Sequence, residues 1–269
     1  MSELNVDGVT LSYREAGQGP AVVLLHGFTG NSRNWALQIR PLVEGGFRTV
    51  SPDLRGHGLS GRPEDPGAYA ITRLAADIVA LADHLGLDRF FLAGHSMGGM
   101  VAQEVALVAA DRVRGLVLVD TSHGPFDLAD RARREELVRI AREQGMEAVF
   151  EYQFNHSPLA SVYQQMPEEN VRVWRQEFVM TAPAAYVGGQ AAMTGRRDTL
   201  PRLATLAIPA LVVVGSGDTP FVEPSQRMAA ALPQGELRII EGAGHSPMFE
   251  APGEFTALLL EFLRRAAGA

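Results

Sequence analysis

Three short glycine-flanked segments of this 269-residue chain carry a hydroxyl, a carboxyl and an imidazole, the groups that nucleophilic catalysis by serine requires. Ser96 stands within a Gly-His-Ser-Met-Gly segment at 94–98, Asp218 ends a Gly-Ser-Gly-Asp run, and His245 follows Gly-Ala-Gly. A serine hydroxyl is a weak nucleophile at neutral pH, so it needs a base to take its proton and an acid to orient that base. We therefore predict a catalytic triad with Ser96 as nucleophile, His245 as base and Asp218 as acid.

The segment around Ser96 has the Gly-x-Ser-x-Gly pattern of a nucleophile elbow, and the chain order Ser, Asp, His is the order associated with that elbow. An apolar stretch precedes the segment and a helical pattern follows it, which places the serine in a tight turn from strand to helix. Gly94 and Gly98 then stand where a Cβ would collide with neighbouring backbone. The turn leaves the hydroxyl at a helix start, where backbone amides favour negative charge.

An oxyanion hole needs two backbone N–H groups, one from the residue after the nucleophile and one from an earlier loop. Met97 supplies the first by its position. The second is expected from Phe28, in the His-Gly-Phe-Thr-Gly turn at 26–30 that directly follows an apolar strand pattern. Both amides would hold the negative charge that develops on a carbonyl oxygen under attack.

Strand and helix patterns alternate along the chain, and this rhythm predicts an α/β fold with a mostly parallel sheet flanked by helices. Loops after the carboxyl ends of parallel strands are where such sheets build their sites. We expect a hairpin at 4–16, strands at 21–25, 47–51, 89–93, 115–119, 210–214 and 236–240, and helices at 35–44, 72–85, 97–109, 224–232 and 253–266.

The alternation stops after the strand that ends near Val119. From 122 to about 200 only helical spacing remains, with expected helices at 129–144 and 168–180, and we interpret this stretch as a helical cap inserted into the core. The expected division is a first core segment at 1–121, a cap at 122–199 and a second core segment at 200–269. The cap would form the roof of the substrate pocket.

Composition excludes several functions. The net charge of −7 argues against nucleic acid as a partner, since binding to phosphates needs positive charge. The chain has no cysteine, which excludes disulfides, thiolate nucleophiles and Cys-type zinc sites. It has no apolar run long enough to cross a bilayer, and its polar, acidic start does not resemble a signal peptide, so we expect a cytoplasmic protein with no membrane partner.

Taken together, these motifs resemble the α/β-hydrolase superfamily, and within it the capped serine hydrolases: carboxylesterases, enol-lactonases, cofactor-free haloperoxidases and carbon–carbon bond hydrolases. The resemblance covers 4–121 and 200–269. It rests on the 26–28 turn, the 53–60 turn, the 94–98 elbow, and the Gly-Asp and Gly-His pairs that contain the acid and the base. It implies a small-molecule substrate and neither a metal nor an organic cofactor.

Three further residues could compete for triad roles. Asp120 follows the Val119 strand, a position that a minority of the superfamily uses for the acid, and His123 lies close by in sequence. We expect Asp120 to cap the turn into the cap domain instead. His57, in the 53–60 turn, is expected to pack and form hydrogen bonds rather than act as a second base.

Hydrolysis of a carboxylic ester or lactone through an acyl-enzyme on Ser96 is the first expectation. The alternative keeps the triad but cleaves a carbon–carbon bond in a β-diketone-like acid, or performs a related lyase step, which would need a cation such as Arg33 or Arg196 for the substrate carboxylate. A non-catalytic ligand receptor is a minor alternative. Relatives with aspartate at the elbow are epoxide hydrolases or dehalogenases, and the serine at position 96 argues against both.

Substrate-binding candidates are large apolar side chains in the cap and beside the base. We name Phe150, Phe154 and Trp174 in the cap, and Met248 three residues after His245. The physiological substrate and the oligomeric state stay open at this point.

Overall fold

An eight-stranded sheet forms the centre of the protein, which we describe from a computed structural model covering residues 1–125, 131–157 and 164–268. The strand order is β1-β2-β4-β3-β5-β6-β7-β8, and only the pairs β1–β2 and β2–β4 are antiparallel. The strands are β1 (Ser2–Val6), β2 (Val9–Ala16), β3 (Ala21–Leu25), β4 (Arg48–Pro52), β5 (Phe90–His95), β6 (Val113–Val119), β7 (Ala210–Gly215) and β8 (Gly235–Ile240).

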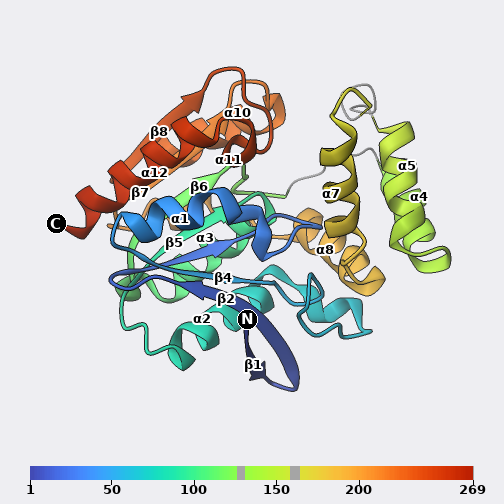
Figure 1. Cartoon of the computed structure of the whole chain (residues 1–269), viewed down its shortest axis with the longest axis horizontal. Coiled ribbons are helices and arrows are strands. Elements are labelled where there is room, and N and C mark those ends of the chain that lie inside the picture. Colours follow the sequence, from blue (N-terminus) through green and yellow to red (C-terminus); the bar gives the residue numbers. More distant parts are fainter. Residues whose placement is uncertain (126–130, 158–163, 269) are drawn as a thin grey trace.

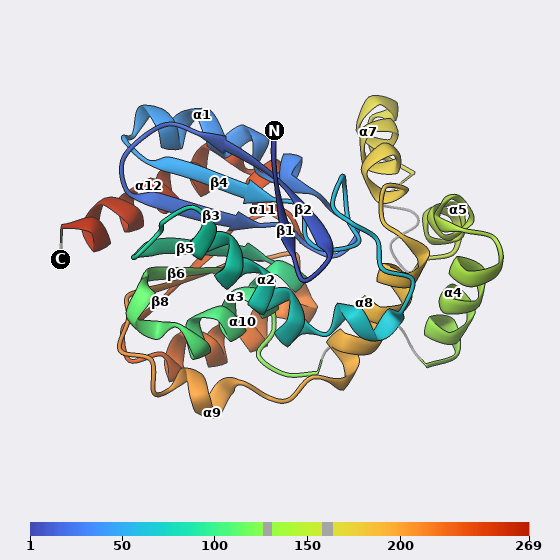
Figure 2. The same cartoon turned by 90° about the horizontal axis from the view of Figure 1, so that it is seen from below.

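Helices cover both faces of the sheet (Figures 1 and 2). One face carries α1 (Ala36–Glu44), α11 (Pro247–Glu250) and α12 (Pro252–Ala267); the other carries α2 (Ile71–His84), α3 (Met97–Val108) and α10 (Thr219–Ala231). Short helical turns lie at Ser32–Trp35, Pro66–Tyr69, Ala110–Arg112 and, as α9, at Leu200–Leu203. Among the described helices, none combines the length and the apolar character needed to cross a membrane.

The central strands are apolar along their whole length because both of their faces are covered. Every residue of β3, for example, is buried, and its side chains alternate between the two core clusters on either side of the sheet. This is the pattern that the continuous apolar runs of the sequence indicate. The α/β class and the mostly parallel sheet are confirmed.

Among the described residues between β6 and β7, we call the helices that precede α9 the cap helices: α4 (Arg131–Glu143), α5 (Met146–His156), α7 (Glu168–Phe178) and α8 (Pro183–Gly195). They stand together beside the sheet, on the right of Figure 1. They have an apolar cluster of their own, which includes Phe150, Phe178 and Tyr186. The expected helices at 129–144 and 168–180 correspond to α4 and α7, and residues 129 and 130 lie outside the described residues.

The chain passes from the core to the cap helices after Ser122 and His123 and returns to the core at Thr199, and hydrogen bonds join these two crossings. The Thr199 amide donates to the His123 carbonyl at 2.8 Å, and the Thr199 hydroxyl donates to Gln103 Oε1 at 2.6 Å. Gln103 Nε2 and an Arg196 guanidinium nitrogen both donate to the Ser122 carbonyl, each at 2.9 Å. We call these five residues the junction. It fastens both crossings to α3, the helix that begins after Ser96.

Helix α10 begins earlier than expected. It starts at Thr219, directly after Asp218, five residues before the predicted start at Pro224. Pro220 lies in the first turn, where a missing N–H costs nothing, and Pro224 lies inside the helix. Asp218 is therefore held at the start of a helix.

Candidate active site

The carboxyl ends of β5, β7 and β8 bring the three predicted triad residues together. His245 Nε2 lies 3.1 Å from Ser96 Oγ, and His245 Nδ1 lies 2.7 Å from Asp218 Oδ2. Because a carboxylate oxygen accepts, Nδ1 carries the proton and Nε2 is left to accept from the serine hydroxyl. The arrangement can take a proton from Ser96 and stabilise the imidazolium that results.

Ser96 occupies a sharp turn between β5 and α3. Its φ of 53° and ψ of −119° lie in a region that few non-glycine residues adopt. Gly98 makes this turn sterically possible: a Cβ at residue 98 would lie 2.4 Å from the His26 carbonyl oxygen and 2.5 Å from that of Leu25. The helix start is thereby packed directly against the end of β3.

The amides of Phe28 and Met97, the two expected donors of the oxyanion hole, have no acceptor among the described residues. Met97 is the first residue of α3, where the N–H has no partner within the helix. Phe28 lies in a tight turn that is closed by the Gly30 amide on the Gly27 carbonyl at 3.1 Å and has Thr29 at a φ of 60°. Amides in such positions are suited to receive an oxyanion.

Two residues that the sequence analysis did not single out hold the loop of the base. His95 Nε2 donates to the His245 carbonyl at 2.7 Å, and burial lowers the pKa of His95 to about 3, so the ring is neutral. Glu250 accepts from the amides of Gly244 and Ser246, which flank the base, at 2.6 and 2.8 Å. The ring of Phe221 stacks on the imidazole of His245 at 4.8 Å. No sequence signal marks the contacts of His95 and Phe221, because they depend on how separate loops meet, whereas Glu250 lies only four residues after Ser246.

Asp120 lies beside the triad, which differs from the expected role as a cap of the turn. Its Oδ1 accepts from the Gly215 amide at 3.0 Å, and its side chain is wholly buried. One ligating atom each of Asp120, Asp218 and His245 lie within 4.8 Å of one another. A metal ion could use such a set, but here His245 and Asp218 are hydrogen-bonded to each other, and we interpret the group as a hydrogen-bonded cluster.

The 53–60 turn is structural in this protein. Both carboxylate oxygens of Asp53 accept backbone amides, from Ser32 at 2.7 Å and from Leu59 at 2.8 Å. His57 is buried, its Nδ1 donates to the Arg55 carbonyl at 3.0 Å, and burial lowers its pKa to about 3. The expected packing role of His57 agrees with this geometry.

The other charged candidates lie apart from the Ser96–His245 contact. His123 pairs with Asp198 at 2.7 Å. Arg33 is exposed. Arg196 belongs to the junction, and burial lowers its pKa to about 10, a value at which it is still charged at neutral pH. Among the described residues, Arg196 has no carboxylate within ion-pair distance.

The predicted pocket residues have different positions. Phe150 is buried inside the cluster of the cap helices, and the rings of Trp174 and Phe154 both pack on it, at 4.7 and 5.9 Å from its own. Met248 is wholly buried in the core below the sheet, among Trp35 and its neighbours. This burial argues against the expected contact between Met248 and the substrate.

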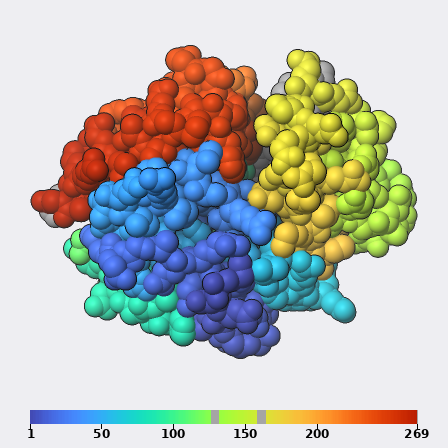
Figure 3. Space-filling model, viewed as in Figure 1, coloured from blue at the N-terminus to red at the C-terminus, as the bar shows by residue number. Residues whose placement is uncertain are grey.

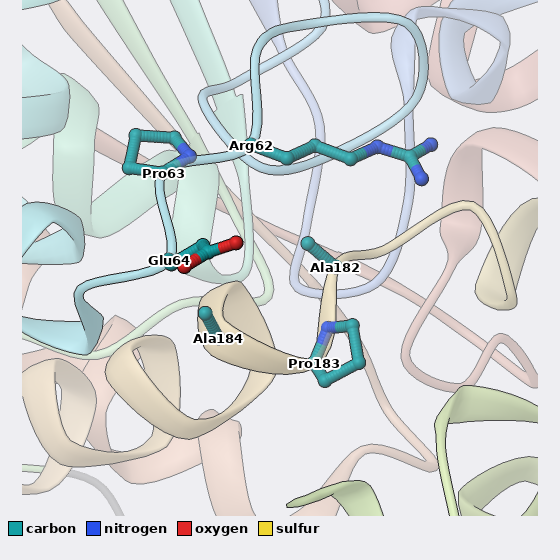
Figure 4. A pocket seen from close by; sticks show the side chains of 6 residues that line it. All are labelled: Arg62, Pro63, Glu64, Ala182, Pro183 and Ala184. Atoms are coloured by element: carbon teal, nitrogen blue, oxygen red, sulfur yellow. The ribbon is translucent and has the colours of Figure 1, made fainter.

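The space-filling view shows a notch between α7 of the cap helices and the C-terminal segments of the core (Figure 3). His245 lies in one of those C-terminal segments, and 37% of its side chain is exposed. A separate cleft of 340 Å³ lies between the loop at 62–64 and the start of α8, and it is lined by Arg62, Glu64 and Pro183, among others (Figure 4). None of the three triad residues lines that cleft.

Comparisons with known proteins agree with this architecture. A family model described as alpha/beta hydrolase fold matches residues 20–252. The chain is 32% identical to the "Putative 2-succinyl-6-hydroxy-2,4-cyclohexadiene-1-carboxylate synthase" of Bacillus subtilis, over 96% of each chain. It is 29% identical to "Epoxide hydrolase A" of Mycobacterium tuberculosis, over 97% of this chain and 96% of that one.

Among solved structures, a thermophilic esterase from Thermogutta terrifontis matches with a TM-score of 0.87 and 31% identity, over 99% of each chain. The match extends over the cap helices as well as the core, since almost the whole chain is aligned. The chain belongs to the α/β hydrolase fold family.

Proposed function

We propose that this protein is a serine hydrolase that cleaves a carboxylic ester, open or cyclic as a lactone, through an acyl-enzyme on Ser96. The observation that carries the proposal is the continuous hydrogen-bonded chain from Ser96 through His245 to Asp218, with contacts of 3.1 and 2.7 Å. The similarity to a thermophilic esterase over 99% of the chain supports it. The substrate would be a small molecule.

Acylation follows from the positions of these groups. His245 Nε2 takes the hydroxyl proton as Ser96 Oγ attacks the carbonyl carbon, and the carbonyl oxygen gains the negative charge. The amides of Phe28 and Met97 donate to that oxyanion. As the intermediate collapses, the ester C–O bond breaks and His245 gives its proton to the leaving alcohol oxygen, which in a lactone stays attached to the acyl group.

Deacylation repeats the steps with water. His245 removes a proton from the water that attacks the acyl carbon, and the second tetrahedral intermediate uses the same two amides. Ser96 leaves as its oxygen takes the proton from His245, and the carboxylic acid is released. Asp218 stabilises the imidazolium in both halves of the reaction.

Two relatives are named for other reactions, and the residues of the site argue differently about each. An epoxide hydrolase is among them, but we propose no such activity here, because the elbow residue is a serine rather than the aspartate that forms an alkyl-enzyme ester. The similarity to the Bacillus subtilis synthase favours, as a second candidate, a lyase or carbon–carbon cleavage of an anionic substrate. That reaction would use the same triad and a cation for the substrate carboxylate.

The test is a substrate panel on the parent and on Ser96→Ala: p-nitrophenyl esters of increasing acyl length, simple lactones, and a vinylogous β-diketone acid. We expect hydrolysis of esters or lactones that Ser96→Ala reduces by at least a thousandfold. Labelling by a fluorophosphonate, located on Ser96 by mass spectrometry, should accompany it. Full activity of Ser96→Ala on every hydrolysed substrate would overturn the proposal, and turnover of the diketone acid alone would favour the second candidate.

A further inference from the structure

Asp120 lies beside the proposed triad but takes no step in the proposed reaction. It follows β6, while Asp218 follows the neighbouring strand β7, and the register Val119 to Val213 sets the two loops side by side. The exposed fraction is 0% for Asp120 and 8% for Asp218. Two carboxyl groups are therefore buried together behind the imidazole.

The backbone holds Asp120 in this place against its own preference. Its φ of 42° lies in the left-handed region, and its amide donates to the Val213 carbonyl at 2.9 Å. On the side chain, Oδ1 accepts from Gly215, whereas the buried Oδ2 faces no donor in the described part of the chain. An ionised Asp120 would thus carry a buried charge that one amide alone satisfies.

A proton on Asp120 Oδ2 removes the buried charge and gives this oxygen a hydrogen to donate. A protonated carboxyl donates, and Asp218 offers a carboxylate oxygen within 4.8 Å of an oxygen of Asp120 as the acceptor. The titratable groups that face Asp120 are Asp218, His245 and Glu250, so two of its three neighbours are acids. Like charges this close do not both ionise readily.

We propose that Asp120 is a positioning residue that acts as a neutral acid: its carboxyl hydrogen is donated to Asp218 and orients that carboxylate toward His245. The proposal rests on the function proposed above. Asp218 then receives hydrogen bonds from both sides, from His245 Nδ1 and from Asp120. Burial, assisted by Asp218 and opposed by the Gly215 amide, raises the pKa of Asp120 to about 10, which agrees with a neutral group at physiological pH.

The decisive comparison is Asp120→Asn against Asp120→Ala. An amide donates to Asp218 through its NH₂ and still accepts from Gly215 through its oxygen, so Asp120→Asn should retain kcat/KM within about threefold. Asp120→Ala removes a hydrogen bond to a charged group and should lower kcat/KM by about tenfold to a hundredfold. If Asp120 were instead the ionised acid of the triad, Asp120→Asn would be as damaging as Asp218→Asn, and the proposal would be wrong.

The pH profile supplies a readout that a purely structural role would not move. The parent should lose activity on the alkaline side as Asp120 ionises beside Asp218, and Asp120→Asn should lack this decline. The free energy of unfolding depends on the same proton. The folded protein holds a proton that the unfolded chain releases above about pH 4, so the parent loses stability as the pH rises above that value. The Tm of Asp120→Asn minus the Tm of the parent should therefore increase from pH 5 to pH 9.

Failure of this proposal is separable from failure of the proposed function. Fluorophosphonate labelling of Ser96 and the loss of activity in Ser96→Ala and Asp218→Asn test the triad without reference to Asp120. With those results in hand, an infrared band of a protonated carboxyl at pH 8 that disappears in Asp120→Asn supports the neutral acid. Absence of that band, or an Asp120→Ala variant with parental kcat/KM and pH profile, overturns it. Urea midpoints of all variants identify those that are not folded.

Discussion

Replacement of Gly98 by alanine should damage the proposed catalytic centre more than it damages the fold. Gly98 lies in the first turn of α3, two residues after Ser96, and packs against the end of β3. An added methyl group would meet two carbonyl oxygens of the backbone, which cannot rotate away as a side chain could. The start of α3 must therefore move relative to β3.

The size of that movement follows from the contact distances. The new Cβ would lie 2.4 Å from the His26 oxygen, and ordinary contacts begin at 3.4 Å, so the helix start must withdraw by about 1 Å. The withdrawal carries Ser96 and the Met97 amide away from the turn that contains Phe28. A misplacement of about 1 Å can lower an enzymatic rate about a hundredfold, and we expect a loss of that order in Gly98→Ala.

The assay is the second-order rate constant for phosphonylation of Ser96 by a fluorophosphonate, which needs the nucleophile and the oxyanion hole but no knowledge of the substrate. The matched control is Gly253→Ala in the first turn of α12, where an added Cβ meets nothing within 4 Å. Urea unfolding of both variants shows which are folded. A folded Gly98→Ala variant with a parental labelling rate would refute the reasoning that this contact sets the geometry of the site.

Two further predictions concern contacts at a distance from Ser96. Gly189→Ala in α8 would place a methyl 2.6 Å from the ring of Phe28, so it should displace the Phe28 turn and lower kcat by about tenfold. The control is Gly195→Ala in the same helix, which has free space around it and should leave kcat unchanged. Steady-state kinetics on the best ester distinguishes the two variants. Asp77→Asn should lower the free energy of unfolding by about 3–5 kcal/mol, because it leaves the Arg55 charge buried without a counter-charge and replaces the acceptor of one of the two hydrogen bonds of 2.8 and 2.7 Å by an NH₂ group. Urea denaturation measures this change in the free energy of unfolding. The double variant Arg55→Met with Asp77→Leu should recover most of the loss, whereas an Asp77→Asn variant as stable as the parent contradicts the argument.

The sheet could be predicted from the sequence because its central strands are buried on both faces and therefore apolar throughout. The meeting of Ser96, Asp218 and His245 has the same origin: each follows a strand of a parallel sheet, and the carboxyl ends of such strands share one edge. Glycine-rich loops marked those three positions. The prediction needed no knowledge of side-chain directions.

Neighbour relations across the sheet could not be predicted in this way. The place of Asp120 depends on the register between β6 and β7, which two uniformly apolar strands do not specify. Met248 lies three residues from His245, yet in the short helix α11 its side chain is buried in the core cluster that contains Trp35. Phe150 has the character of a pocket residue, but the cap helices need an interior of their own.

The junction has a consequence for how such a protein can change over time. The chain leaves the core at Ser122 and His123 and returns at Thr199, and a backbone hydrogen bond of 2.8 Å between Thr199 and His123 joins the exit to the return. The segment between them therefore begins and ends at almost the same point, as an insertion at a surface loop would. Its length and sequence can vary without stretching any strand of the sheet. Selection can rebuild this segment while the residues proposed to perform the chemistry stay where they are.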